Sequence, residues 1–177
     1  HDFNAQELAS LFWSMFCLQI NAALILAFVE STTFSMSDEV DLCALHVCSV
    51  SMSLEYPDIK KKLSPKVLER ADAAWSKSVQ AIQSSELHKD VSRILSSKLN
   101  VTHENEAKVS GLSVDIAFPA SSIVIEVDGP SHYLRTSMGE QCLNGTTNFK
   151  HRLLEESGKN VLHIPYFEWE KLADEIA

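Results

Sequence analysis

Apolar and polar residues alternate along residues 112–128, which predicts two short strands joined by a turn at residues 119–122. When the chain folds back at that turn, Ile116 pairs with Ile125, and every side chain on their face is apolar. A shift of one residue would bring carboxylates onto this apolar face, so the alternation strongly specifies the register of the two strands. We therefore expect an antiparallel hairpin at the centre of the fold.

The opposite face of this hairpin carries three acidic residues. The same register pairs Asp115 with Glu126 and places Asp128 further along that face. Directly opposed residues have Cβ atoms about 5 Å apart, and like charges placed in this way destabilise a sheet. The cluster therefore needs a compensating partner, which is either a bound divalent cation, a neighbouring Lys or Arg, or a proton held by one carboxyl group. A metal site and a simple salt bridge both remain open.

Helical spacing of apolar residues fills the first part of the chain. The apolar run at residues 11–29 is nearly long enough to cross a membrane, but polar residues at 19–21 interrupt it. Two packed helices are therefore expected there, and no membrane span. Further helices are predicted to begin at Asp38 and at Ser64, so residues 1–83 form an all-α helical segment.

The second part of the chain, residues 84–177, mixes strand and helix patterns. The predicted elements are a helix capped by Ser85, a strand at residues 101–108, the central hairpin, a flexible loop at residues 134–144, a helix capped by Thr146 or Thr147, and a strand at residues 160–164. On the later helix Lys150 is expected to face the sheet, whereas His151 and Arg152 are expected to point away. A lysine on a buried stripe needs an anionic partner, and the acidic cluster is the natural one.

Three segments in this second part read VDIAFP, IVIEVDGPSHYL and GTTNFKHRLLEESGKNVLHIPYFEW. Together they resemble the RAP domain, a module of organellar RNA-processing proteins in apicomplexans, algae and plants and of the animal FAST kinase family. The resemblance covers residues 85–172. RAP domains in turn resemble PD-(D/E)XK nucleases. The resemblance implies an α/β fold, with a small restriction-endonuclease-like mixed sheet flanked by helices. The opening residues are similar to helical repeats that precede RAP domains, although no second repeat copy is evident here.

The nuclease resemblance also implies roles for individual residues. In that fold an Asp on one strand and a Glu-x-Lys on the next hold Mg²⁺ and activate water. Asp115 matches the first acid and Glu126 the second, so these two are the implied metal ligands and catalytic acids of an active enzyme. Asp128 stands where the lysine is expected, which argues against hydrolysis. Some variants carry the lysine on the later helix, so Lys150 is the implied catalytic cation if the domain is active; otherwise no cofactor is implied.

Several residues are candidates for contacting RNA. His132 and Tyr133 follow the end of a strand, where loops carry function on a scaffold of this type. The lysine run at residues 60–62 could contact phosphate, but a run between helices is also typical of a solvated connection. The candidate RNA-binding residues are Asp128, His132, Tyr133, Lys150, Arg152, Lys60, Lys61 and Lys62.

Composition limits these readings. The net charge is −9, and neither half is basic, since residues 1–80 carry six basic and ten acidic side chains and residues 81–177 carry nine and fourteen. A protein that relies on non-specific phosphate attraction would be basic, so any RNA contact must be local and specific. The four cysteines lack CxxC spacing, which argues against a zinc site and for thiols in a reducing compartment. Because the first residue is His1, we expect a fragment or processed chain whose targeting segment lies elsewhere.

The resemblance therefore implies an RNA-binding protein of the mitochondrion or another organelle. Its partner would be organellar rRNA or mRNA, and its role RNA maturation or a structural place in a ribonucleoprotein such as the mitochondrial ribosome, with protein partners there. One alternative is a metal-dependent endoribonuclease that uses Asp115, Glu126 and Lys150. Another is a protein-docking scaffold without RNA contact, which the acidic charge mildly supports.

Overall fold

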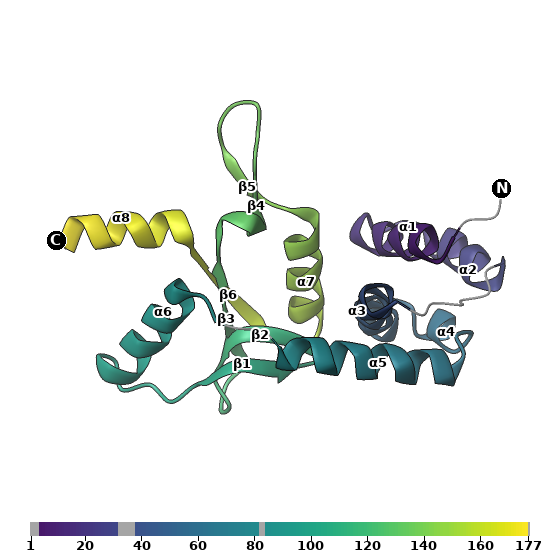
Figure 1. Ribbon diagram of the computed structural model, residues 1–177, viewed down its shortest axis with the longest axis horizontal. Coiled ribbons are helices and arrows are strands. Elements are labelled where there is room, and N and C mark those ends of the chain that lie inside the picture. The colour runs from purple at the N-terminus through teal and green to yellow at the C-terminus, as the bar shows by residue number, and fades with distance from the viewer. Residues whose placement is uncertain (1–3, 32–37, 82–83, 177) are drawn as a thin grey trace. The chain divides into compact units, whose positions relative to one another are not determined.

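The computed structural model describes residues 4–31, 38–81 and 84–176. The chain divides into two compact units, residues 1–82 and residues 83–177 (Figure 1). The first unit is helical in its described part, and the second holds both sheets.

The first unit consists of five described helices. They are α1 (Ala5–Cys17), α2 (Ala22–Ser31), α3 (Glu39–Glu55), α4 (Pro57–Lys60) and α5 (Pro65–Gln80). The predicted break in the apolar run is confirmed, because α1 ends before Gln19, whose φ of 51° is incompatible with a continuing helix. Asp38 caps α3 as predicted. Within the described ranges, no helix is long and apolar enough to cross a membrane.

The second unit contains the central hairpin and the elements packed around it. They are α6 (Glu86–Ser97), β1 (Glu104–Val109), β2 (Leu112–Ala117), β3 (Ile123–Asp128), the 3₁₀ turn η1 (Pro130–His132), β4 (Tyr133–Arg135), β5 (Gln141–Leu143), α7 (Gly145–Glu156), β6 (Asn160–Pro165) and α8 (Tyr166–Ile176). The predicted α/β class, with a helical segment before a mixed sheet, is confirmed.

The main sheet has the strand order β1-β2-β3-β6, in which β1, β2 and β3 are antiparallel neighbours and β6 runs parallel to β3. The predicted register of the hairpin is confirmed near the turn, where Ile116 pairs with Ile125. The predicted pair of Asp115 with Glu126 is not among the ladder pairs of β2 with β3. The parallel strand returns through α7, as a crossover connection between parallel strands requires.

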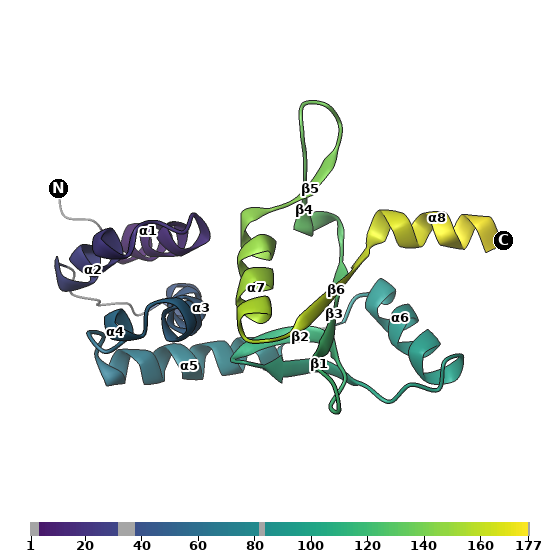
Figure 2. The same cartoon turned by 180° about the vertical axis from the view of Figure 1, so that it is seen from behind.

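Helices lie on both sides of this sheet (Figure 2). The apolar face packs against α6, where Val91 joins Ile116, Ile125 and Val127 in one buried cluster. The other face carries Glu126 and meets α7. The two faces therefore differ in chemistry, since the face toward α7 carries a buried carboxylate that is paired with a lysine.

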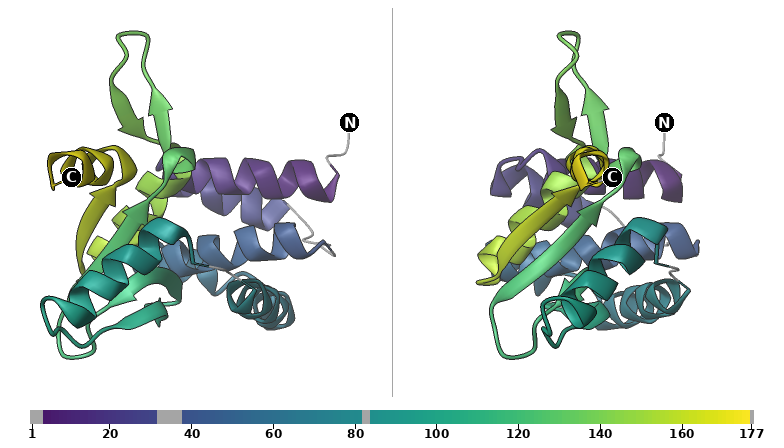
Figure 3. Two further views of the ribbon diagram at one scale, coloured as in Figure 1. Left: turned by 60° about the vertical axis from the view of Figure 1, so that its left-hand side comes forward. Right: turned by 90° about the vertical axis from the view of Figure 1, so that its left-hand side faces the viewer.

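Three local predictions are corrected by the structure. The first strand of this unit covers Glu104–Val109 rather than residues 101–108. Asn144, rather than Thr146 or Thr147, caps α7 by accepting a hydrogen bond from the Thr147 backbone N–H. The predicted flexible loop at residues 134–144 instead forms a second, two-stranded sheet of β4 and β5, which stands out from the main sheet (Figure 3).

Candidate functional site

One row of ionisable side chains crosses the main sheet from edge to edge. The pairing of β3 with β6 places Glu126 opposite His163. Between β1 and β2, Asn105 pairs with Ile116 and Ala107 with Val114, so Glu106 and Asp115 lie at the same level between these two pairs. The regular backbone is disturbed at this row, because Glu106 has a φ of 50° and Asp115 does not form an ordinary ladder pair with β3. Four strands therefore bring titratable groups to one level of the sheet.

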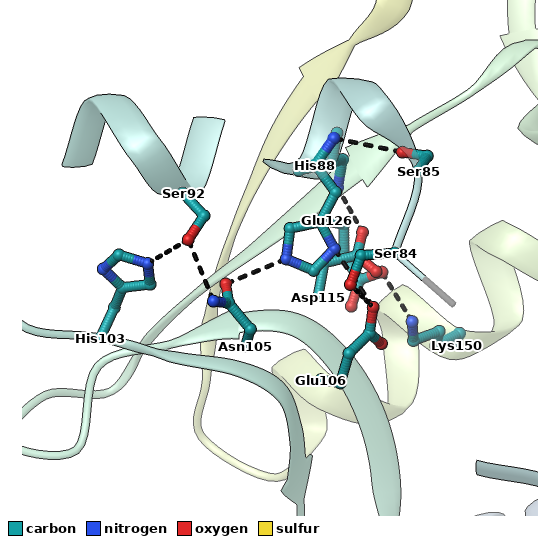
Figure 4. A network of polar contacts seen from close by, with 11 residues as sticks. Ser84, Ser85, His88, Ser92, His103, Asn105, Glu106, Asp115, Glu126 and Lys150 are labelled. Atoms are coloured by element: carbon teal, nitrogen blue, oxygen red, sulfur yellow. Dashed lines mark hydrogen bonds and ion pairs between the residues drawn. The ribbon is translucent and has the colours of Figure 1, made fainter. Parts of the chain in front are cut away.

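Asp115 lies in the middle of this row and bonds to the neighbouring strand. Its Oδ2 accepts a hydrogen bond of 2.6 Å from the backbone N–H of Val127, in place of a backbone carbonyl. Its carboxylate also lies in a group with His88 and Glu106, whose ligand atoms are all within 4.8 Å of one another. Figure 4 shows Asp115 between this group and Glu126. The predicted side-by-side acids are thus separated by a backbone contact.

Glu126 is a buried acid of the hairpin that pairs with a lysine. Its side chain is 2% exposed, and Lys150 Nζ donates to its Oε2 over 2.6 Å. Burial raises the pKa of Glu126 to about 7, against the opposing charge of Lys150 and with the further help of Asp115. Its Oε1 is buried with no hydrogen-bond partner in the part of the chain that the structure describes. The predicted pairing of Lys150 with the acidic cluster is confirmed.

Asp128 is fully buried, with a side-chain exposure of 0%. Its two carboxylate oxygens bond to two imidazoles, with His132 Nδ1 at 2.7 Å and His163 Nδ1 at 2.5 Å. Burial alone would raise the pKa of Asp128, but these two hydrogen bonds and the histidine charges outweigh it and lower the pKa to about 2. This burial argues against the predicted direct contact of Asp128 with RNA. The residue that reaches the surface is its partner His132, which is 36% exposed.

The prediction that His151 points away from the sheet is wrong. His151 is buried, and its ring lies 3.7 Å from the ring of His163, centroid to centroid. Burial and the neighbouring His163 lower the pKa of His151 to about 4. Arg152 is half-buried, and its guanidinium lies 5.0 Å from the centre of the Phe149 ring.

Tyr133 starts the protruding hairpin and joins an aromatic group at its base. Its ring lies 5.2 Å from that of Phe167 and 6.1 Å from that of Tyr166. Burial raises the pKa of Tyr133 to about 12, so its hydroxyl is neutral at physiological pH. Its half-buried ring is packed chiefly against these aromatic neighbours, which is the sealing role that such clusters commonly play.

The predicted lysine run lies in the other unit and is engaged by nearby groups. Lys60 donates to the hydroxyl of Ser53 over 2.6 Å. Lys61 pairs with Asp58 and Lys62 with Glu30, all with well-exposed side chains. These contacts are those of a solvated surface, where such pairs contribute little to stability.

The donor atoms of the magnesium site that the nuclease resemblance implies are partly taken up by other contacts. Lys150 occupies Oε2 of Glu126, and the Val127 N–H occupies Oδ2 of Asp115. Mg²⁺ requires a near-octahedral shell of oxygen atoms at about 2.0–2.1 Å, so an ion shared by both acids would have to bind their second oxygens, of which Oε1 of Glu126 is buried. In this structure the two acids serve as one half of an ion pair and as a contact between strands.

Sequence analysis missed four residues of this network, which are His88, Asn105, Glu106 and His163. His88 on α6 is buried, with Nδ1 at 3.2 Å from Glu106 and Nε2 at 3.0 Å from Asn105 (Figure 4). His163 is on β6, in register with Glu126. The alternation along β6 was the sequence signal that could have identified His163. It shows on which face of the sheet His163 lies only when the pairing of β6 with β3 is known.

Comparisons with known proteins cover most of the chain. The chain is 30% identical over 141 residues to a "RAP domain-containing protein, chloroplastic" from Oryza sativa subsp. japonica, a match that covers 78% of this chain and 21% of that protein. The chain thus spans about a fifth of the length of this curated relative. The family model described as "RAP domain" matches residues 125–177, the segment that contains Glu126, Asp128, Lys150 and His163. This match confirms the resemblance predicted from the sequence, and over residues 125–177 the chain is similar to the RAP domain family.

Proposed function

We propose that this chain binds single-stranded RNA in an organelle through its second unit and does not cleave it. The RNA is organellar rRNA or mRNA, which the chain binds during RNA maturation or within a ribonucleoprotein. The name of the rice relative supports an organellar site for that protein, the chloroplast, and does not favour the mitochondrion.

The observation that carries this proposal is the ion pair between Glu126 and Lys150. A hydrolytic site would keep its second acid open to a metal ion and to water. Here that acid is 2% exposed and holds a lysine at 2.6 Å. The arrangement neutralises the acid and fixes the lysine, which suits recognition better than hydrolysis.

Two cations on the open side of this network are suited to phosphate. Lys150 is 30% exposed and His132 is 36% exposed, so each can reach a ligand while its carboxylate partner stays buried. The pKa of His132 is raised, chiefly by its hydrogen bond to Asp128, so the ring carries positive charge more readily than a free histidine. Cations held in place by buried partners lose little side-chain freedom when a phosphate binds. They supply the local contact that an acidic protein requires.

Loss of these two cations should weaken RNA binding. We expect His132→Gln to raise the Kd for a labelled single-stranded RNA by about tenfold, because a charge-assisted hydrogen bond to phosphate is worth about 1.5–3 kcal/mol. The paired change Glu126→Gln with Lys150→Met should have a similar effect, and it removes both charges together, so no buried charge is left without a partner. Fluorescence anisotropy with the full chain measures both.

Matched controls come from the same unit. His103 bonds to Ser92, and Lys98 is exposed at the end of α6, so His103→Gln and Lys98→Met should leave the Kd within twofold, about the range of a neutral surface change. Equal weakening by the controls would contradict the assigned surface. Cleavage of the RNA in Mg²⁺ that disappears in Asp115→Ala would contradict the binding-only proposal and favour the nuclease.

RNA binding should also weaken as the pH rises. Below its raised pKa His132 is a cation that attracts phosphate, and above that pKa this attraction is lost. We expect the Kd to increase between about pH 6 and about pH 9 for the wild type and to change much less for His132→Gln. An identical pH profile in the two proteins would show that His132 does not contact the RNA.

A further inference from the structure

Three elements of the second unit converge on a pocket of metal-ligating side chains. Asp128 at the end of β3, His151 on α7 and His163 on β6 each offer one ligand atom, and these atoms all lie within 4.8 Å of one another. The set consists of one carboxylate and two imidazoles. This combination suits zinc and similar transition-metal ions, whereas Mg²⁺ and Ca²⁺ prefer oxygen ligands alone.

A buried nitrogen without a partner marks the same place. Nε2 of His151 is buried and has no hydrogen-bond partner among the described residues. The residue as a whole is 8% exposed. Leaving such a group unpaired costs free energy, and native structures rarely do so without a reason. A metal ion bound by the imidazoles would remove this cost.

We propose that Asp128, His151 and His163 form a binding site for a zinc-class divalent cation, which ties α7 to the end of β3 and to β6. The ion takes the place of the proton between His163 Nδ1 and Asp128 Oδ2, which are now 2.5 Å apart. Ligands of a tetrahedral zinc ion at about 2.0–2.1 Å stand about 3.3 Å from one another, so side-chain movements of less than about 1 Å are enough. His132 keeps the other carboxylate oxygen of Asp128, at 2.7 Å.

A second cluster is a weaker candidate for the same chemistry. His88, Glu106 and Asp115 also lie within 4.8 Å of one another. Unlike the first cluster, this one contains no buried donor atom without a partner among the described residues. Both ring nitrogens of His88 have partners, and Asp115 Oδ2 binds the Val127 N–H. The cysteine spacing that argued against a zinc site does not bear on either cluster, since neither contains cysteine.

The test is isothermal titration calorimetry, in which Zn²⁺ is added to the chelator-treated full chain. We expect one saturable site per chain, and a Kd that rises by more than about 100-fold in His151→Gln and in His163→Gln, because loss of a ligand should exceed the 10–100-fold cost of losing an outer partner. His88→Gln and His103→Gln are matched controls that should keep the site. Co²⁺ added in place of Zn²⁺ should give the intense visible bands of a tetrahedral site.

Several results would overturn the proposal. The first is the absence of saturable Zn²⁺ binding, and the second is unchanged Zn²⁺ affinity in both His151→Gln and His163→Gln. The third is a loss of Zn²⁺ binding confined to His88→Gln, which would place the ion in the other cluster. Should a variant fail to fold, histidine NMR of the wild type decides, because Zn²⁺ must shift the ring signals of His151 and His163 and leave that of His103 in place. RNA is absent from all these measurements, so the metal site can fail while RNA binding stands, and the reverse.

Discussion

Replacement of Asp128 by Asn should lower the free energy of unfolding of the second unit by about 3 kcal/mol at neutral pH. The carboxylate is fully buried and accepts from two imidazoles, His132 and His163. An Asn side chain can accept from one ring with its carbonyl oxygen, but it turns an N–H donor toward the other. The Asn N–H and one imidazole N–H then face each other without an acceptor. Leaving a donor without a partner costs more free energy than removing both partners of a hydrogen bond.

The pH dependence of this contribution follows from the lowered pKa of Asp128. The pKa is about 2 in the folded chain and 3.8 ordinarily, so the stabilisation is present above about pH 4 and is lost as the pH falls toward about 2. Hydrogen exchange of peptides from β3, β6 and α7 across a urea series measures the loss locally. Asp90→Asn, at a half-exposed surface pair with Arg93, is the matched control and should change stability by less than about 0.5 kcal/mol. Equal effects of the two substitutions would contradict the role given to Asp128.

Glu126→Gln should gain stability relative to the wild type as the pH rises from about 5 to about 8. The pKa of Glu126 is about 7 in the folded chain and 4.5 ordinarily, chiefly because of burial. Between these values the folded chain holds a proton that the unfolded chain has released. The contribution of Glu126 to stability therefore falls with rising pH, by up to about 3 kcal/mol across the interval.

His132 acts in the same direction but in a different pH range. Its raised pKa means that its contribution is complete below about pH 6.5 and is lost only above it. His151 acts in the opposite direction, because its pKa of about 4 makes its contribution grow between about pH 4 and about pH 6.5. Urea unfolding of the wild type and of Glu126→Gln at several pH values isolates Glu126, because both histidines are present in both proteins. Glu155→Gln, at an exposed position of α7, should keep the wild-type dependence of stability on pH. The same pH dependence in Glu126→Gln as in the wild type would contradict the raised pKa of Glu126.

Local patterns were sufficient to predict the frame of the fold. The alternation along the hairpin fixed the pairing of Ile116 with Ile125, and capping residues such as Asp38 and Ser85 marked the helix starts. These features depend on neighbours in sequence or on a single turn. The placement of Lys150 against an acid also followed from a local rule, since a lysine on a buried stripe requires a negative partner.

The remainder of the site depends on contacts between distant segments. His163 lies beside Asp128 only because β6 pairs in parallel with β3. His88 contacts Glu106 only because α6 packs beside β1. The inward position of His151 was missed because a polar residue on a helix is normally assigned to the solvent side, and its partner could not be known. The β4–β5 hairpin was missed because strands of three residues carry too short an alternation to recognise.

Ultraviolet crosslinking of a bound single-stranded RNA, followed by mapping of the crosslinked peptides, tests the central claim most directly. The claim is that RNA lies over the network at His132 and Lys150, and that the buried acids only hold these cations in place. We predict crosslinks in peptides that contain His132 with Tyr133 and in peptides that contain Lys150, with the RNA still intact in Mg²⁺. Crosslinks confined to the lysine run at residues 60–62, or RNA cut during incubation, would contradict the account.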